Sequence, residues 1–284
     1  METIKPLNNI SFNTIFSAFN KAFEDYEMQL NKNELHTMLW RRGFVTELSF
    51  GAFENEKLIA FTLNGIGFYN NIKTAYDTGT GTLKEYRGQG LATKIFKHSI
   101  PFLKKANVTQ YLLEVLQHNS KAVSVYKNLG FEISREFNYF VKKADAIELS
   151  INALDPSYHV GQLDLSKRES MIKFWDFIPS WQNSFEAISR KTDDFKIIGV
   201  YKNGNLVGYT IFEPNLGDIS QIAVDKNFRR KGIASILLKE ILKTNQHNSI
   251  KVINTEVGCS SITEFLQSNS IFLEGKQFEM IKQL

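Results

Sequence analysis

The sequence contains a single cysteine, Cys259, among 284 residues. One cysteine allows no disulfide within the chain and no thiolate cluster, which favours a reducing compartment. The five histidines show no ligand spacing, so we expect no metal site. No unbroken apolar run approaches the ~20 residues of a membrane-spanning helix, and the first residues carry no apolar leader. These absences predict a cytoplasmic protein without a membrane partner.

The chain also lacks a large excess of charge of one sign. The net charge is +4, and the 34 lysines and arginines are scattered along the chain, so a nucleic-acid partner is not expected. Hydrophobic residues make up 43% and charged residues 23% of the chain, as is typical of globular proteins. The length suits two domains better than one core. Nothing in the sequence indicates an oligomeric state.

What the sequence does contain is an internal repeat. The segment Gly51–Thr62 has the alternation of a β-hairpin and matches Gly199–Thr210, which lies 148 positions later. A second pair of segments, Arg87–Ala92 and Arg229–Ala234, is 142 positions apart. The first half therefore has six extra residues, which we expect within 64–71. Two diverged copies of one domain explain this pattern better than a single large fold.

The paired segments read Arg87-Gly88-Gln89-Gly90-Leu91-Ala92 and Arg229-Arg230-Lys231-Gly232-Ile233-Ala234. Each follows a strand-like run and precedes a helix-like run, so free first-turn N–H groups can converge on a phosphate. A P-loop is excluded because no Lys followed by Ser or Thr comes after Gly90. A dinucleotide fingerprint is excluded because Thr93 stands in place of its last glycine. The sequence thus predicts two anion sites of another kind.

The shared pattern, Arg-x-x-Gly-x-Ala, closely resembles the acyl-CoA signature of the GNAT superfamily of N-acetyltransferases. The first half adds Asn119-x-x-Ala122-x-x-x-Tyr126-x-x-x-Gly130-Phe131, which is similar to the second signature of that family. The resemblance implies an α/β (α+β) fold with two tandem domains, 1–145 and 158–284, each a mixed, mostly antiparallel central sheet flanked by helices. It also implies acetyl-CoA as cosubstrate, a small-molecule or peptide amine as acceptor, and a CoA contact from the asparagine. The residues expected to contact acetyl-CoA are Thr82, Leu83, Arg87, Gly88, Gln89, Gly90, Leu91, Ala92, Thr93 and Asn119 in the first half, with Arg229, Lys231, Gly232 and Ala234 in the second.

Direct acetyl transfer needs an unprotonated amine, a donor for the developing oxyanion and a proton for the departing thiolate. We expect the oxyanion donor to be a backbone N–H near Thr82 or Leu83. Tyr126 is the candidate acid, because a phenol pKa of about 10 is close enough to the ~8.5 of a thiol for proton donation. Asp77 and Glu114, on the two strands that the family splays apart, are the candidate bases. Arg87 is expected to contact phosphate or to brace the loop.

The second half departs from the family pattern. Its counterparts of the asparagine, tyrosine and glycine of the second signature are Cys259, Leu266 and Ser270. A leucine cannot donate a proton, so catalysis is assigned to the first half. The alternatives are catalysis in the second half, or a non-catalytic acyl-CoA-binding module.

An aromatic stripe also marks the first expected helix, Ser11–Tyr26. Its rings, which recur at alternating four- and three-residue spacing, are Phe12, Phe16, Phe19, Phe23 and Tyr26. The stripe predicts either core packing or one wall of an acceptor pocket. A second helix is expected over 32–42, ended by a left-handed Gly43.

Overall fold

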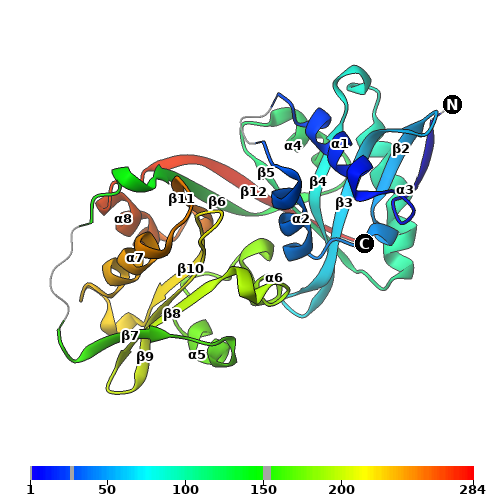
Figure 1. Ribbon diagram of the computed structural model, residues 1–284. Helices are drawn as coiled ribbons and strands as arrows, with labels where there is room; N and C mark the ends of the chain where they lie inside the picture. The colour runs from blue at the N-terminus through cyan, green and yellow to red at the C-terminus, as the bar shows by residue number, and fades with distance from the viewer. Residues whose placement is uncertain (1, 26–28, 150–154) are drawn as a thin grey trace. The chain divides into compact units, whose positions relative to one another are not determined.

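Residues 2–25, 29–149 and 155–284 are described by the computed structural model of the chain (Figure 1). Within these residues the chain forms two units: unit 1 is Met1–Ser134 with Phe278–Leu284, and unit 2 is Arg135–Gln277. Each unit thus takes its last strand from the opposite half of the sequence, as the colours in Figure 1 show. Tyr26, the last ring of the predicted aromatic stripe, lies outside the described residues.

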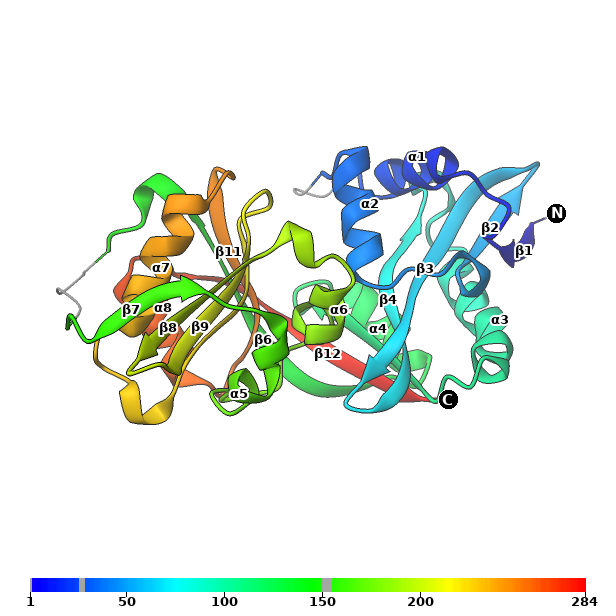
Figure 2. The same ribbon diagram turned by 60° about the horizontal axis from the view of Figure 1, so that its bottom comes forward.

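Unit 1 is built on an ordered run of neighbouring strands, β1-β2-β3-β4-β5, with the end of β12 beside β5. The first four strands pair antiparallel, whereas β4 and β5 pair parallel. Figure 2 shows α1 and α2 on one side of β3 and β4, and α3 on the other. The strands are β1 (Thr3–Pro6), β2 (Phe50–Glu54), β3 (Lys57–Tyr69), β4 (Ile72–Thr82), β5 (Gln110–Leu116) and β12 (Leu273–Gln283), and the helices are α1 (Phe12–Ala22), α2 (Lys32–Arg41), α3 (Leu91–Lys105) and α4 (Ser120–Asn128).

Unit 2 repeats this order, with β6 in the place that the end of β12 takes in unit 1. Its strands follow the sequence β6-β11-β10-β9-β8-β7, in which only β10 and β11 pair parallel. The strands are β6 (Glu132–Lys143), β7 (Tyr158–Gln162), β8 (Lys196–Lys202), β9 (Asn205–Glu213), β10 (Asp218–Val224) and β11 (Ser249–Glu256), and the helices are α5 (Arg168–Ile172), α6 (Phe185–Ser189), α7 (Ile233–Thr244) and α8 (Ser260–Ser268).

The predicted hairpins form, and they repeat in detail. The register of β2 with β3 shifts between Ala52 and Phe53, and that of β8 with β9 shifts between Val200 and Tyr201, again 148 positions later. A second bulge interrupts β4 at Thr78 and β10 at Ser220, 142 positions apart. The six extra residues of the first half lengthen the β3–β4 hairpin. Residues 64–69 are paired strand residues of β3, so the extra length lies within the predicted range 64–71.

Local signals placed the first two helices correctly. The Ser11 hydroxyl accepts the N–H of Thr14 and caps α1, and Gly43 follows α2 with φ of 78°. The aromatic stripe packs into the core: the Phe19 ring stacks on Phe61 of β3 with centroids 6.1 Å apart. Of the two interpretations of the stripe, core packing is the one that these contacts support.

The core of unit 2 has two faces. Tyr209 and Ile211 of β9 pack with residues of α5 and α6, whereas Phe212 packs with α7 and α8. Because successive strand residues point to opposite sides of a sheet, helices cover both faces of β9. Leu266, the residue at the tyrosine position of the second signature, is fully buried among the α7–α8 side chains.

Candidate active site

The candidate site of unit 1 begins where β4 and β5 separate. The parallel ladder runs from Thr74 opposite Gln110 to Tyr76 opposite Leu112 and then stops. The next residue of β4 is Asp77, which is followed by the bulge at Thr78. A bulge bends its strand and turns side chains out of the regular alternation. The two strands that the resemblance expected to splay apart therefore do so, and Asp77 lies at the start of the gap.

Asp77 is buried, with 8% of its surface exposed. Its carboxylate accepts the N–H of Gly79 at 2.9 Å, the Thr80 hydroxyl at 2.8 Å and the Tyr126 hydroxyl at 3.2 Å. Burial disfavours the charged carboxylate and outweighs these hydrogen bonds, so the pKa of Asp77 rises from 3.8 to about 6. A carboxyl group with this pKa is ionised at neutral pH and still accepts a proton readily.

Tyr126 reaches this carboxylate from α4. Its ring meets the rings of Phe96 and Phe131 edge to face, each with centroids 5.8 Å apart. Two edge-to-face contacts hold the ring in one orientation and leave the hydroxyl pointing at Asp77 Oδ2. The structure thus brings together two of the three residues predicted for catalysis.

Glu114, the third predicted residue, has a different environment. Its carboxylate hydrogen-bonds the hydroxyl of Tyr76, and burial followed by this negative charge raises the pKa of that tyrosine. Tyr76 and Asp77 are consecutive residues of β4, so their side chains leave opposite faces of the sheet. Glu114 therefore lies on the Tyr76 side and does not join the Asp77–Tyr126 pair.

At the end of β4, the two predicted oxyanion donors differ in whether their N–H group is already hydrogen-bonded. The Leu83 N–H is already donated to the Ile59 carbonyl at 2.9 Å, so it is not open to a ligand. Thr82 pairs with Ala60. In an antiparallel ladder the residue before such a bond turns its own N–H away from the partner strand. The Thr82 N–H therefore points to the β5 side, along the edge at which the gap opens.

The loop of unit 1 leaves the first amides of α3 accessible. Gly88 and Gly90 have φ of 81° and 73°, and a Cβ at either would meet no atom within 4 Å. Gly90 is the N-cap of α3, and no side chain accepts from the amides of the first turn, those of Leu91, Ala92 and Thr93. Gln89 is exposed beside them. A pyrophosphate fits this open, positively polarised helix start.

Two side chains that were predicted to contact acetyl-CoA form hydrogen bonds within the protein. The Arg87 side chain turns back to the end of β4, where its Nε donates to the Thr82 carbonyl at 3.3 Å. Of the two roles expected for Arg87, bracing the loop is therefore the one that its contacts support. Asn119 is the N-cap of α4, and its Oδ1 accepts the N–H of Ala122 at 3.2 Å. This oxygen is occupied by the helix start.

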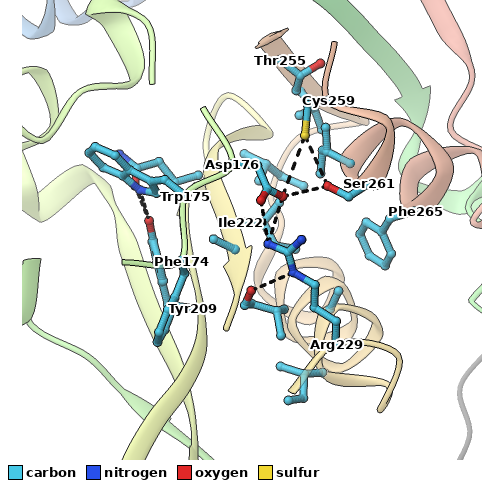
Figure 3. Close-up of a pocket in the computed structure, with 18 of the residues that line it drawn as sticks. Phe174, Trp175, Asp176, Tyr209, Ile222, Arg229, Thr255, Cys259, Ser261 and Phe265 are labelled. Atoms are coloured by element: carbon cyan, nitrogen blue, oxygen red, sulfur yellow. Dashed lines mark hydrogen bonds and ion pairs between the residues drawn. The ribbon is translucent and has the colours of Figure 1, made fainter. Parts of the chain in front are cut away.

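Unit 2 contains a cavity of about 940 Å³ at the corresponding place. It is lined by β10, β11, the loop 229–233, the start of α8 and the segment 174–179, part of which Figure 3 shows. Arg230 and Gly232 have φ of 61° and 80°, which match Gly88 and Gly90. The loop shape is thus kept even where arginine has replaced glycine. Lys231 and Ala234 also line the cavity.

A chain of polar groups at this cavity was missed by the sequence reasoning. The Trp175 indole donates to the Tyr209 hydroxyl at 2.7 Å (Figure 3). This hydroxyl donates to Gln221 Oε1 at 2.7 Å. Gln221 Nε2 in turn donates to the Asn183 carbonyl at 2.7 Å. Burial raises the pKa of Tyr209. Tyr209 lies in the repeated hairpin, but its counterpart Phe61 has no hydroxyl and the counterpart of Gln221 is Gly79, so the repeat does not mark these contacts.

Two residues that line the same cavity each have a buried side-chain oxygen that lacks a hydrogen-bond partner within the described part of the chain: Asn183 Oδ1 and Thr255 Oγ1. Buried polar atoms are nearly always paired with protein, water or a ligand. Cys259 lies nearby at the start of α8, with its sulfur 3.3 Å from the Ser261 hydroxyl (Figure 3). The cavity therefore has both apolar and polar residues in its walls.

Across the described ranges, no group of three or more His, Cys, Asp or Glu side chains has the arrangement of a metal site. Over the same residues, every helix is too short or too polar to cross a membrane.

Comparisons with known proteins agree with this architecture. The family model described as the acetyltransferase (GNAT) family matches residues 12–131 and 162–260. N-alpha-acetyltransferase 30 of Schizosaccharomyces pombe is 31% identical over 102 residues, which cover 35% of this chain and 68% of that protein. A GCN5-related N-acetyltransferase from Sphaerobacter thermophilus superposes with a TM-score of 0.74 at 12% identity, covering 99% of this chain and 95% of that one. A tandem GNAT protein from the clavulanic acid biosynthesis pathway gives a TM-score of 0.75 at 11% identity, with 100% and 98% covered. These matches confirm the predicted fold of two tandem domains.

Proposed function

The chain belongs to the acetyltransferase (GNAT) family, and from this premise we propose that it moves an acetyl group from acetyl-CoA to a primary amine, with the chemistry in unit 1. The observation that carries the assignment is the hydrogen bond from Tyr126 to Asp77 at the opening between β4 and β5. Unit 2 has Leu266 at the corresponding position and no such pair. The domain assignment that accompanies this proposal is 1–145 for the catalytic copy and 158–284 for its partner.

Acetyl-CoA supplies an acetyl group activated as a thioester. The loop amides from Leu91 to Thr93 bind its pyrophosphate, and the Thr82 N–H stabilises the negative charge that develops on the carbonyl oxygen. The space beside Gly88 and Gly90 is open, so the loop can receive the pyrophosphate without rearrangement.

The Asp77–Tyr126 pair carries the proton. As the C–N bond forms, Asp77 accepts the proton that the amine nitrogen loses. As the C–S bond breaks, Tyr126 gives its hydroxyl proton to the departing sulfur. The resulting tyrosinate then recovers a proton from the protonated Asp77, because the two groups are already hydrogen-bonded at 3.2 Å. One proton has moved from nitrogen to sulfur and both side chains are restored.

The acceptor is a primary amine on a peptide or a small molecule. The relative from Schizosaccharomyces pombe is named an N-alpha-acetyltransferase, which favours a peptide N-terminus over a small amine. A panel of peptides with different first residues and of small amines, assayed by release of the CoA thiol, distinguishes the two classes. The Tyr126→Phe variant should lose about a hundredfold in kcat in this assay.

A control for that variant is Tyr201→Phe, the same chemical change in unit 2. Its hydroxyl donates only to the Gln162 carbonyl at 3.3 Å. Full activity of Tyr126→Phe, with turnover abolished by disruption of the loop at Gly232, would move the active site to unit 2.

A second candidate function for unit 2 is binding of acyl-CoA without turnover. The large cavity and the matching loop support a ligand there, and Leu266 supplies no proton. Calorimetric titration of the intact chain with CoA tests this. Two bound CoA molecules per chain support the candidate, and one bound molecule that is lost in a Gly90 variant contradicts it.

A further inference from the structure

The arginine of each phosphate loop is held by an aspartate from a distant part of its own unit. In unit 1, Arg87 Nη1 lies 3.1 Å from Asp25 Oδ2. In unit 2, Arg229 Nη2 lies 2.9 Å from Asp176 Oδ2, as Figure 3 shows. The two arginines are 142 positions apart, whereas the two aspartates are 151 positions apart. The contact has therefore persisted through changes in chain length between aspartate and loop.

The same two arginines also donate hydrogen bonds to the strand that leads into the loop. Arg87 Nε donates to the Thr82 carbonyl at 3.3 Å, and Arg229 Nε donates to the Val224 carbonyl at 3.2 Å. A nearby lysine joins each aspartate: Lys84 at 3.2 Å in unit 1, and Lys226 at 3.8 Å in unit 2. An aspartate, an arginine and a strand-end carbonyl thus form one arrangement that occurs twice in the chain.

In unit 1 this arrangement lies next to the proposed oxyanion donor. The Thr82 carbonyl and the Thr82 N–H leave the strand on the same side, away from β3. Arg87 also donates to the Ala22 carbonyl at the end of α1, at 2.9 Å. The guanidinium therefore ties the edge of β4 at which Thr82 lies to the end of α1. Five fixed donors in one plane suit arginine to such a three-way contact.

Asp25 decides where the guanidinium points. Arg87 is 40% exposed even in this ion pair, so without the Asp25 charge only the neutral Thr82 and Ala22 carbonyls would hold the guanidinium against the attraction of the negatively charged pyrophosphate. With it, the arginine stays on the strand and the loop amides remain open for the ligand.

We propose that Asp25 is a positioning residue for acetyl transfer: through Arg87 it fixes the end of β4, and with it the Thr82 N–H that stabilises the oxyanion. This inference rests on the proposed chemistry in unit 1. Asp176 makes the same contact with Arg229 in unit 2. Unit 2 has Leu266 at the position of Tyr126, so in this proposal Asp176 positions a loop that does not take part in turnover. The pair of aspartates provides a matched control within one chain.

The test is a set of four variants of the full chain: Asp25→Asn, Asp25→Glu, the exposed control Asp145→Asn for kinetics, and Asp176→Asn for hydrogen exchange. Asparagine keeps the size of aspartate and removes the charge that holds the guanidinium. Asp25→Asn should lower kcat about tenfold while KM for acetyl-CoA changes less than twofold, because misplacement of one donor weakens binding of the transition state and leaves the loop amides in place. Asp145→Asn, at an exposed position outside both loops and the unit 2 cavity, should change both constants less than twofold, and Asp25→Glu should recover part of the kcat.

Hydrogen exchange followed by mass spectrometry gives a readout that does not depend on turnover. Asp25→Asn should speed exchange about tenfold in peptides that cover 82–90, including the Leu83 N–H, and leave 224–232 unchanged. Asp176→Asn should do the reverse. Asp25 is exposed, so both variants are expected to keep the melting temperature of the parent chain.

Unchanged exchange over 82–90 in Asp25→Asn overturns the proposal, as do equal losses of kcat in Asp25→Asn and Asp145→Asn. A different result would contradict the proposed function: full activity of Tyr126→Phe would show that the chemistry does not take place in unit 1. In that case, altered exchange in Asp25→Asn would still show that Asp25 fixes the end of β4 through Arg87.

Discussion

Tyr126 donates its hydroxyl hydrogen to Asp77 Oδ2 across 3.2 Å, from α4 to the point at which β4 leaves β5. The two residues are far apart in the sequence and have complementary roles in the proposed acetyl transfer, because Asp77 accepts a proton and Tyr126 donates one. Asp77 is buried and holds a raised pKa of about 6, and Tyr126 has a hydroxyl aimed at its carboxylate. A proton can pass between them without movement of either chain segment.

The pH dependence of acetyl transfer should follow Asp77. Below pH 6 the carboxyl group is protonated and cannot accept the proton of the amine, so kcat/KM should rise with pH through an apparent pKa of about 6. In Asp77→Asn this rise should disappear and the remaining rate should be at least tenfold lower. Initial rates from pH 5 to 8 with a weakly basic amine measure this. An unchanged acidic limb in Asp77→Asn would contradict the assignment of the base.

The same substitution should stabilise the fold at neutral pH. The folded-state pKa of Asp77 is raised from 3.8, so its contribution to stability is fully present below the unfolded-state pKa and is lost as pH rises through about 6. At 1.36 kcal/mol per pKa unit, the loss is about 3 kcal/mol at most. Asparagine keeps an acceptor for the Gly79 N–H and carries no charge.

Urea unfolding at two pH values measures this effect. Asp77→Asn should unfold with a free energy about 1–3 kcal/mol above the parent chain at pH 8, and with little difference at pH 4. Asp145→Asn, at an exposed position, serves as the control and should have no such pH-dependent effect. A destabilised Asp77→Asn at pH 8 would show that the charged form is the one that the fold prefers.

Gly90→Ala should weaken acetyl-CoA binding. The new Cβ meets no protein atom within 4 Å, but it enters the space through which the pyrophosphate approaches the α3 amides. We expect KM for acetyl-CoA to rise about tenfold, since loss of one charge-assisted hydrogen bond is typically about 1.5 kcal/mol. Gly204→Ala has a similar φ of 77° and open surroundings in a hairpin turn, so it reports the backbone strain alone. Equal effects of the two substitutions on KM would exclude ligand contact at Gly90.

Cys259 should report whether unit 2 holds CoA. It is the sole thiol of the chain and it lines the cavity, so a thiol reagent labels one position. A saturating non-reactive CoA analogue should slow labelling at least fivefold if the cavity binds it. Gly232→Ala should remove this protection, whereas Gly90→Ala should leave it. Labelling at one rate with and without the analogue would indicate that unit 2 is empty under turnover conditions.

Much of the site could be predicted because its parts are local. A loop between a strand and a helix is encoded by adjacent residues, and helices do begin directly after Gly90 and Gly232, as predicted. The pairing of Asp77 with Tyr126 could be named only as two separate candidates, because sequence spacing says nothing about which side chains meet across elements. Glu114 shows this limit: the same reasoning selected it, and the sheet placed it with Tyr76.

Asp25 and Asp176 were missed although a weak signal was present. The sequence reads Phe23-x-Asp25 in the first half and Phe174-x-Asp176 in the second, but at an offset that differs from those of the hairpin and the loop. A search for repeats at a constant offset passes over such a pair. Only the contacts of Arg87 and Arg229 show that the two aspartates are equivalent.

The sequence by itself determined that the chain repeats, that each copy carries a strand, an open glycine turn and a helix, and that only the first has a tyrosine in its second signature. These features follow from backbone preferences and residue chemistry over a few neighbouring positions. The tertiary structure alone decided which carboxylate meets that tyrosine, which amide at the end of β4 is already bonded, and which strand completes each unit. Those outcomes depend on pairing between distant segments and on exclusion of water from Asp77, and no short stretch of sequence encodes either.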